Sequence, residues 1–212
     1  MLHVMRVSTG DRVVLFDGTG AEYQASIEHQ DRTTVTVGIE SKELISRELP
    51  GQLIIASALP KGDRQKVLVE KLTELGVHQF YPLETSRSVV PFTVSIHKRL
   101  ERCVIEASKQ CGRNELMTVH EAMSLPQLLN HTWSEFSRYV TDLTGRSVSI
   151  LQDMNRVIVA IGPEGGFTDD ELENARQNGW RILSFGARIL RVETAAINAA
   201  AHCAAHMTSV VS

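Results

Sequence analysis

The chain has 212 residues, more than one average domain of ~150, so one large domain or two unequal ones are both compatible with its length. Apolar residues make up 42% and charged residues 22%, which is typical of a globular protein with a real core and excludes intrinsic disorder. The three cysteines are an odd number without C-x-x-C spacing. This pattern argues against a disulfide framework or a structural zinc site and favours a reducing, cytoplasmic compartment. No apolar run approaches the ~20 residues of a membrane span, so we expect no membrane contact.

The net charge of −3 hides an uneven distribution. Residues 1–50 hold 5 Lys and Arg against 8 Asp and Glu, whereas residues 51–212 hold 17 of each sign. Within the second part, residues 87–113 contain six basic side chains and only two acidic ones. On charge alone a solvated helix face is the favoured interpretation, and a surface for a polyanion is the alternative.

The first fifty residues alternate apolar and polar side chains with period two. We expect strands over 12–16, 22–27 and 33–39, with a tight turn where Asp17-Gly18 supplies positive backbone angles. From Pro50-Gly51 onward, strands alternate with helices, which predicts a parallel sheet with crossover helices. The sequence therefore predicts a small β domain over 1–50 and an α/β domain over 51–212.

Further elements of the α/β domain follow from hydrophobic periodicity. The helix over 63–75 is expected to bury Val67, Leu68, Leu72 and Leu75 and to end at Gly76. Pro126 is expected to interrupt the segment 121–136. The alanine-rich last helix is typical of core or of a subunit interface. The expected strands are 52–59, 77–83, 138–143, 156–161 and 181–185, and the other helices are 95–110 and 194–208.

A glycine-rich loop gives the strongest local signal. The buried strand 157–161 runs directly into Gly162-Pro163-Glu164-Gly165-Gly166, and Thr168 with Glu171 has the spacing of a capping box that opens a helix. Ligands bind at strand ends of parallel sheets, where glycine lets them approach the backbone. The spacing matches neither G-x-G-x-x-G nor a P-loop, so no phosphate cradle is indicated. A ligand loop and a merely tight strand-to-helix turn both fit.

A second loop, 183–194, follows the next strand and precedes the last helix. Since the ends of parallel strands meet at one sheet edge, we expect the two loops to form a pocket. Arg188, Arg191 and Glu193 are charges in an otherwise apolar stretch. They either bridge one another or face a polar ligand, and the sequence leaves both open.

Four ordered segments carry a family resemblance: 61–77, 110–114 (QCGRN), 161–167 (IGPEGGF) and 190–195 (LRVETA). They resemble the signature segments of the RsmE family, SPOUT-superfamily enzymes that use S-adenosylmethionine to methylate uridine N3 in small-subunit ribosomal RNA. The resemblance implies an α/β fold with a trefoil-knotted parallel-sheet domain, a homodimer and an N-terminal PUA-like β-barrel. Because the chain starts at a point inside the family's barrel, we expect its opening strand to be missing.

The resemblance also implies roles for particular residues. Arg191 is expected to orient the base or to stabilise charge on a uracil oxygen, and Glu193 to shape the site or to assist proton removal. The RNA path is expected to include Arg87, Lys109, Gln110 and Arg113. S-adenosylmethionine is expected to contact Ile161, Gly162, Pro163, Glu164, Gly165, Gly166, Leu183, Phe185, Gly186, Leu190, Glu193, Thr194 and Ala195.

Other functions remain compatible with the sequence. The chain could methylate another RNA, or it could be a non-catalytic RNA-binding or ribosome-assembly factor. His202 and His206 stand one helical turn apart, but H-E-x-x-H needs a glutamate after the first histidine and no third ligand is evident. We therefore expect no metal. The family resemblance implies small-subunit ribosomal RNA, in an assembled subunit, as the main partner.

Overall fold

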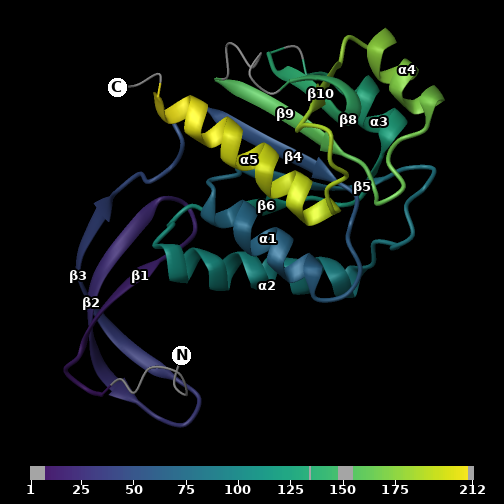
Figure 1. Cartoon of the computed structure of the whole chain (residues 1–212). Helices are drawn as coiled ribbons and strands as arrows, with labels where there is room; N and C mark the ends of the chain where they lie inside the picture. Colours follow the sequence, from purple (N-terminus) through teal and green to yellow (C-terminus); the bar gives the residue numbers. More distant parts are fainter. Residues whose placement is uncertain (1–7, 134, 148–154, 210–212) are drawn as a thin grey trace. The chain divides into compact units, whose positions relative to one another are not determined.

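The protein is described from a computed structural model that defines residues 8–133, 135–147 and 155–209 (Figure 1). It contains two compact units. The first comprises the chain up to Glu48 together with Gly112–Leu116, and the second comprises Leu49–Cys111 and the chain from Met117 onward. The sequence predicted a break near residue 50 but gave no sign that a segment from the middle of the chain belongs to the first unit.

The first unit contains a three-stranded antiparallel sheet of β1 (Arg12–Phe16), β2 (Ala21–Gln30) and β3 (Val35–Leu44). All three predicted strands are present, and β2 and β3 extend further than predicted. Gly18 has φ +88°, as the predicted turn requires. The Asp17 carboxylate accepts hydrogen bonds from Thr19, which lower its pKa to about 2. The predicted turn is therefore present, and the Asp17 side chain adds hydrogen bonds that the sequence analysis did not predict.

The segment Gly112–Leu116 completes this unit through buried polar contacts. Asn114 is 1% exposed, and its Nδ2 donates to the backbone oxygen of Ile45 at 2.7 Å and to the Glu22 carboxylate at 3.1 Å. Arg113 is also buried, and its Nε donates to Glu48 Oε1 at 2.8 Å. The segment thus ties together strand β2 and the chain that follows β3.

The second unit contains a seven-stranded sheet whose neighbouring strands run parallel, in the order β10-β8-β9-β4-β5-β6, with β7 also paired to β5. The five predicted strands are all present. The two that the sequence missed have two residues each, too few to show a period. The trefoil knot stays a prediction. The strands are β4 (Gln52–Ser57), β5 (Gln79–Glu84), β6 (Thr118–Val119), β7 (Met123–Ser124), β8 (Ser137–Ser147), β9 (Arg156–Ile161) and β10 (Arg181–Ser184).

Helices cover both faces of this sheet (Figure 1). Figure 1 shows α1 and α5 on one face and α3 and α4 on the other. Ile54, Ile158 and Ala160 belong to the core cluster that includes residues of α3 and α4. Their neighbours along each strand point to the opposite face, so both faces of the central strands are mainly apolar. The helices are α1 (Arg64–Glu74), α2 (Val94–Cys111), α3 (Leu125–Asn130), α4 (Asp169–Gln177) and α5 (Val192–Ser209).

Helix ends follow the predicted signals with one exception. After α1, Gly76 has φ +79°, and the Val77 N–H bonds back to Leu72 O at 3.0 Å, which confirms the predicted stop. Pro126 does not interrupt a helix. It lies in the first turn of α3, where its missing N–H costs no hydrogen bond, and Ser124 caps that turn.

The predicted buried face of α1 is partly wrong. Val67 is 42% exposed, whereas Val69 and Gln65 are buried together with Leu68 and Leu72. The Gln65 amide donates to Pro60 O at 2.8 Å, which satisfies this buried polar group in a way that a hydrophobic pattern cannot anticipate. None of the helices in the described ranges is long and apolar enough to cross a membrane.

Candidate functional site

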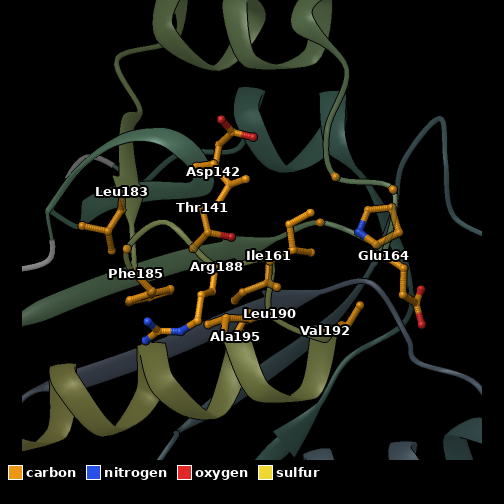
Figure 2. A pocket seen from close by; sticks show the side chains of 17 residues that line it. Thr141, Asp142, Ile161, Glu164, Leu183, Phe185, Arg188, Leu190, Val192 and Ala195 are labelled. Carbon is orange, nitrogen blue, oxygen red and sulfur yellow. The ribbon is translucent and has the colours of Figure 1, made fainter.

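A hollow of about 200 Å³ lies at the edge of the sheet where β9 and β10 end, beside the middle of β8 (Figure 2). Residues 141–143 within β8, the loop after β9, the loop after β10 and the first turn of α5 form its walls. This is the edge where parallel sheets bind ligands. Its lining residues are Thr141, Asp142, Leu143, Ile161, Gly162, Pro163, Glu164, Gly165, Gly166, Leu183, Phe185, Gly186, Arg188, Ile189, Leu190, Val192 and Ala195.

The glycine loop after β9 is held in a defined shape. Gly166 has φ +67°, and its N–H bonds to Pro163 O at 2.8 Å. A Cβ at Gly162 would lie 3.0 Å from the Phe167 ring, so packing limits this position. Arg87 donates to Gly165 O at 2.6 Å. The glycines therefore serve a tight turn, and the same loop lines the hollow, so the ligand interpretation stays a prediction that this arrangement supports.

The helix after this loop begins as predicted. Thr168 accepts from the Glu171 N–H at 3.2 Å, and Glu171 accepts from the Thr168 N–H at 2.8 Å, which confirms the capping box. Glu171 also accepts from the Ser86 N–H at 2.9 Å. These hydrogen bonds, against the opposing effect of burial, keep the pKa of Glu171 below its ordinary value. The capped start of α4 and the Arg87 contact thus anchor the glycine loop from two sides.

Apolar side chains and separated charges line the hollow. Ile161, Leu183 and Leu190 supply apolar wall, and the Phe185 ring stacks on His202 with an interplanar angle of 8°. Figure 2 shows the carboxylates of Asp142 and Glu164 on different sides of these apolar side chains. The arrangement suits a ligand with a flat apolar part and a cationic part.

An excursion in β8 forms one wall. The pairing of β10 with β8 jumps from Ile182 opposite Val140 to Leu183 opposite Arg146, so residues 141–145 leave the ladder. Asp142 accepts from the Thr144 N–H at 2.8 Å and shapes the excursion. Gly145 brings the chain back, and a Cβ there would lie 2.5 Å from the backbone carbonyl carbon of Leu183. Only glycine fits without moving the backbone.

Replacing Gly145 with alanine is expected to lower the free energy of unfolding by about 1–3 kcal/mol, because the added methyl group forces β8 away from β10. The displacement also moves the wall formed by Thr141 and Asp142. Urea denaturation measures the loss. Arg146→Ala, at the exposed next position, is the control and is expected to stay within 0.5 kcal/mol of the parent, as is usual for surface substitutions. Equal losses in both variants would contradict the steric explanation.

The structure brings most of the predicted cofactor residues together. All of them line the hollow except Glu193 and Thr194. Thr194 is exposed, whereas Glu193 is buried and its Oε2 lies 3.5 Å from Arg64 Nη1. Arg191 has an exposed side chain and stands between Leu190 and Val192, which both line the hollow. Roles for these residues stay predictions.

The charged loop residues do not form the mutual network that was one of the two interpretations left open by the sequence. No ion pair joins Arg188 or Arg191 to Glu193 in the ranges that the structure defines, and Arg188 lines the hollow. Of the two interpretations left open by the sequence, contact with a ligand fits Arg188. Glu193 pairs with Arg64 on another element instead.

The predicted RNA residues have diverse surroundings. Arg87 holds the glycine loop, and Lys109 pairs with Glu106 at 2.9 Å on α2. Gln110 is exposed at the end of α2. Arg113 is buried in the first unit against Glu48. Less of the positive charge in 87–113 is therefore available to a partner than the sequence predicted, and an RNA role for the four residues stays a prediction.

Several residues of the site carry no signal that was used for the predictions above. Thr141, Asp142 and Leu143 end the predicted strand 138–143, so the strand-end rule that located the glycine loop could have found them. Arg64 gave no such signal, because its partners lie far away in the sequence. No cluster of three or more His, Cys, Asp or Glu side chains able to hold a metal occurs among the residues with defined positions.

Comparison with known protein families gives a consistent result. Residues 47–204 match the family described as an RNA methyltransferase domain, and residues 1–40 match the RNA methyltransferase PUA domain. The chain is 32% identical to ribosomal RNA small subunit methyltransferase E of Bacillus subtilis (strain 168), over 94% of this chain and 83% of that protein. The chain belongs to the ribosomal RNA small subunit methyltransferase E family.

Solved structures of similar proteins agree with this family. The Neisseria gonorrhoeae ribosomal RNA small subunit methyltransferase E, bound to S-adenosyl methionine, superposes with a TM-score of 0.89 at 26% identity, covering 99% of this chain and 87% of that chain. A SpoU methyltransferase from Streptomyces viridochromogenes has a TM-score of 0.55 at 13% identity, covering 82% of this chain and 65% of that chain. The second likeness, at 13% identity, concerns the fold alone.

Proposed function

We propose that this chain transfers the methyl group of S-adenosylmethionine to N3 of a uridine in small-subunit ribosomal RNA, within an assembled subunit. The observation that carries the proposal is the hollow at the carboxyl edge of the sheet, built from the predicted glycine loop and the loop after β10. Relatives that match most of the chain are named as methyltransferases of this RNA.

The residues of the hollow fit S-adenosylmethionine. Apolar walls from Ile161, Leu183 and Leu190 suit an adenine ring, and the bare backbone of the glycine loop allows close approach. The loop lacks phosphate-binding spacing, and this cofactor carries no phosphates. Carboxylates of Asp142 and Glu164 favour its positive charges. The residues 161–166 and 183–195 would therefore hold it.

The mechanism assigns positioning to the chain itself. When bound, the cofactor supplies an electrophilic methyl group, and the enzyme must orient the uridine N3 toward it and accept the N3 proton. Arg191, exposed beside the hollow, would orient the base or stabilise charge on a uracil oxygen. Glu193 is buried and contacts Arg64, which favours a role in shaping the site.

Assembly and domain roles extend the proposal. Residues 1–50 would act as an RNA-binding accessory domain and residues 51–212 as the catalytic domain. A homodimer is supported by Ile189 and Leu143, which border the hollow yet are 81% and 51% exposed. The protein would act in the cytoplasm, where its ribosomal substrate is assembled.

The deciding experiment incubates the full chain with unmodified small ribosomal subunits and S-adenosylmethionine, followed by nucleoside mass spectrometry. We expect 3-methyluridine that depends on both protein and cofactor. A different methylated nucleoside would instead support an enzyme with another target. Absence of any methylation, together with no calorimetric binding of the cofactor, would overturn the enzymatic function and favour a non-catalytic RNA-binding factor.

A further inference from the structure

Arg64 occupies a bridging position that neither the sequence nor the proposed chemistry accounts for. It is the first residue of α1, directly after the loop that leaves β4. Its guanidinium lies 3.3 Å from Glu164 Oε1 and 3.5 Å from Glu193 Oε2. Glu164 belongs to the glycine loop and Glu193 to the first turn of α5. One side chain therefore connects three segments, two of which line the hollow.

Burial makes the contact with Glu193 consequential. The Glu193 side chain is 10% exposed, and its Oε2 is buried without a hydrogen bond that meets normal geometry. The 3.5 Å approach of Arg64 is thus a charge contact and not a well-formed hydrogen bond. A carboxylate removed from water is costly unless it is paired. Arg64, together with the amino end of α5, supplies that compensation.

The backbone that carries Arg64 is held in place by its neighbour Gln65. The adjacent Gln65 is 3% exposed and donates to Pro60 O at 2.8 Å, while its Oε1 accepts from Arg99 on α2. The start of α1 is therefore fixed by two other segments. A guanidinium with two donor edges can contact two carboxylates at once, which a lysine ammonium does less well.

We infer that Arg64 is a positioning residue of the hollow: it pairs with Glu164 and Glu193 and so holds the glycine loop and the start of α5 at the separation that the cofactor needs. The three ionised side chains sum to one negative charge, which suits a cationic sulfonium or ammonium group. The inference rests on the proposed function for the identity of the ligand. Its structural part, the coupling of Arg64 to the two glutamates, does not.

The test measures cofactor affinity of the full chain by calorimetric titration with S-adenosylmethionine. Arg64→Met is expected to raise the dissociation constant about tenfold, and Arg64→Lys to raise it less. At saturating cofactor the turnover rate is expected to change little, because Arg64 acts on binding geometry. Lys66→Met is the matched control, since Lys66 lies on the same helix and pairs with Glu70 on the surface, so the affinity of this variant should equal that of the parent.

A double-mutant cycle with Glu193→Gln separates positioning from a general effect on α1. If the pair acts as a unit, Arg64→Met costs less affinity in the Glu193→Gln background, where only the Glu164 contact remains to be lost, than in the parent; fully additive effects would overturn the inference. The same cycle in thermal unfolding without cofactor is expected to be non-additive. Unchanged affinity in Arg64→Met would also overturn the inference, whereas failure of the parent chain to bind cofactor would refute the proposed function alone.

Discussion

Replacing Arg113 with methionine is expected to destabilise the first unit by about 3–5 kcal/mol. Arg113 and Glu48 are 6% and 8% exposed, and the guanidinium donates from Nε to Oε1 at 2.8 Å and from Nη2 to Oε2 at 2.5 Å. Methionine preserves much of the buried length but leaves the Glu48 carboxylate without this cation. The cost comes mainly from the buried Glu48 carboxylate losing its guanidinium partner rather than from losing packing.

The loss of stability is expected in the first unit. Arg113 lies in the segment Gly112–Leu116, and the amide of Asn114 in the same segment donates to Gly20, Glu22 and Ile45 of that unit. Hydrogen exchange of the amides in β1, β2 and β3 is therefore expected to accelerate in Arg113→Met. Urea denaturation measures the loss of stability, and the exchange rates of these amides show whether the loss lies in the first unit. The double variant Arg113→Met with Glu48→Met is expected to recover most of the stability, because both charges are then absent.

Lys109→Met provides the matched comparison. Lys109 pairs with Glu106 on the surface of α2, with side-chain exposures of 38% and 71%, and such pairs contribute at most about 1 kcal/mol. Lys109 and Arg113 were both predicted to face RNA from the same basic stretch. They differ in burial, because the Lys109 pair is exposed and the Arg113 pair is buried. If Arg113→Met cost no more than Lys109→Met, the buried ion pair would not be a stabilising element of this unit.

The glycine loop shows how much of the site local sequence can predict. The apolar strand 157–161, the glycines after it and the Thr168–Glu171 capping box each follow from interactions between near neighbours. Because parallel strands end at one edge of the sheet, the segment 183–190 is then expected beside this loop. Periodicity, capping and topology were sufficient because every step depends on contacts within an element or between adjacent strands.

Other parts of the site and fold depend on contacts between distant segments. Gly145 is required because Leu183 lies against it, and no pattern around residue 145 records that neighbour. Arg64 acquires its partners only when the loop after β9 and the start of α5 approach α1. Arg113 looked like one charge in a basic stretch, yet folding buries it against Glu48. Local charge counts cannot separate such residues from a solvated surface.

Replacing Arg191 with alanine is expected to reduce single-turnover methylation about 100-fold while leaving cofactor affinity largely unchanged. Arg191 precedes α5, and its backbone oxygen accepts from the Ala195 N–H at 2.8 Å, a contact that alanine also makes. Its exposed side chain does not line the hollow, although Leu190 and Val192 on either side do. The substitution therefore removes a cation from the edge of the hollow without altering its walls.

Arg181→Ala is the matched control for this variant. Arg181 is exposed at the first residue of β10, the end of the strand opposite to the hollow, so the same loss of charge there is expected to leave methylation unchanged. Rapid-quench single-turnover assays with saturating enzyme and small subunits separate the chemical step from RNA binding. If Arg191→Ala methylated at the parental rate under these conditions, the guanidinium would not act on the base. A weaker affinity for S-adenosylmethionine with unchanged chemistry would instead assign Arg191 to the cofactor side of the hollow.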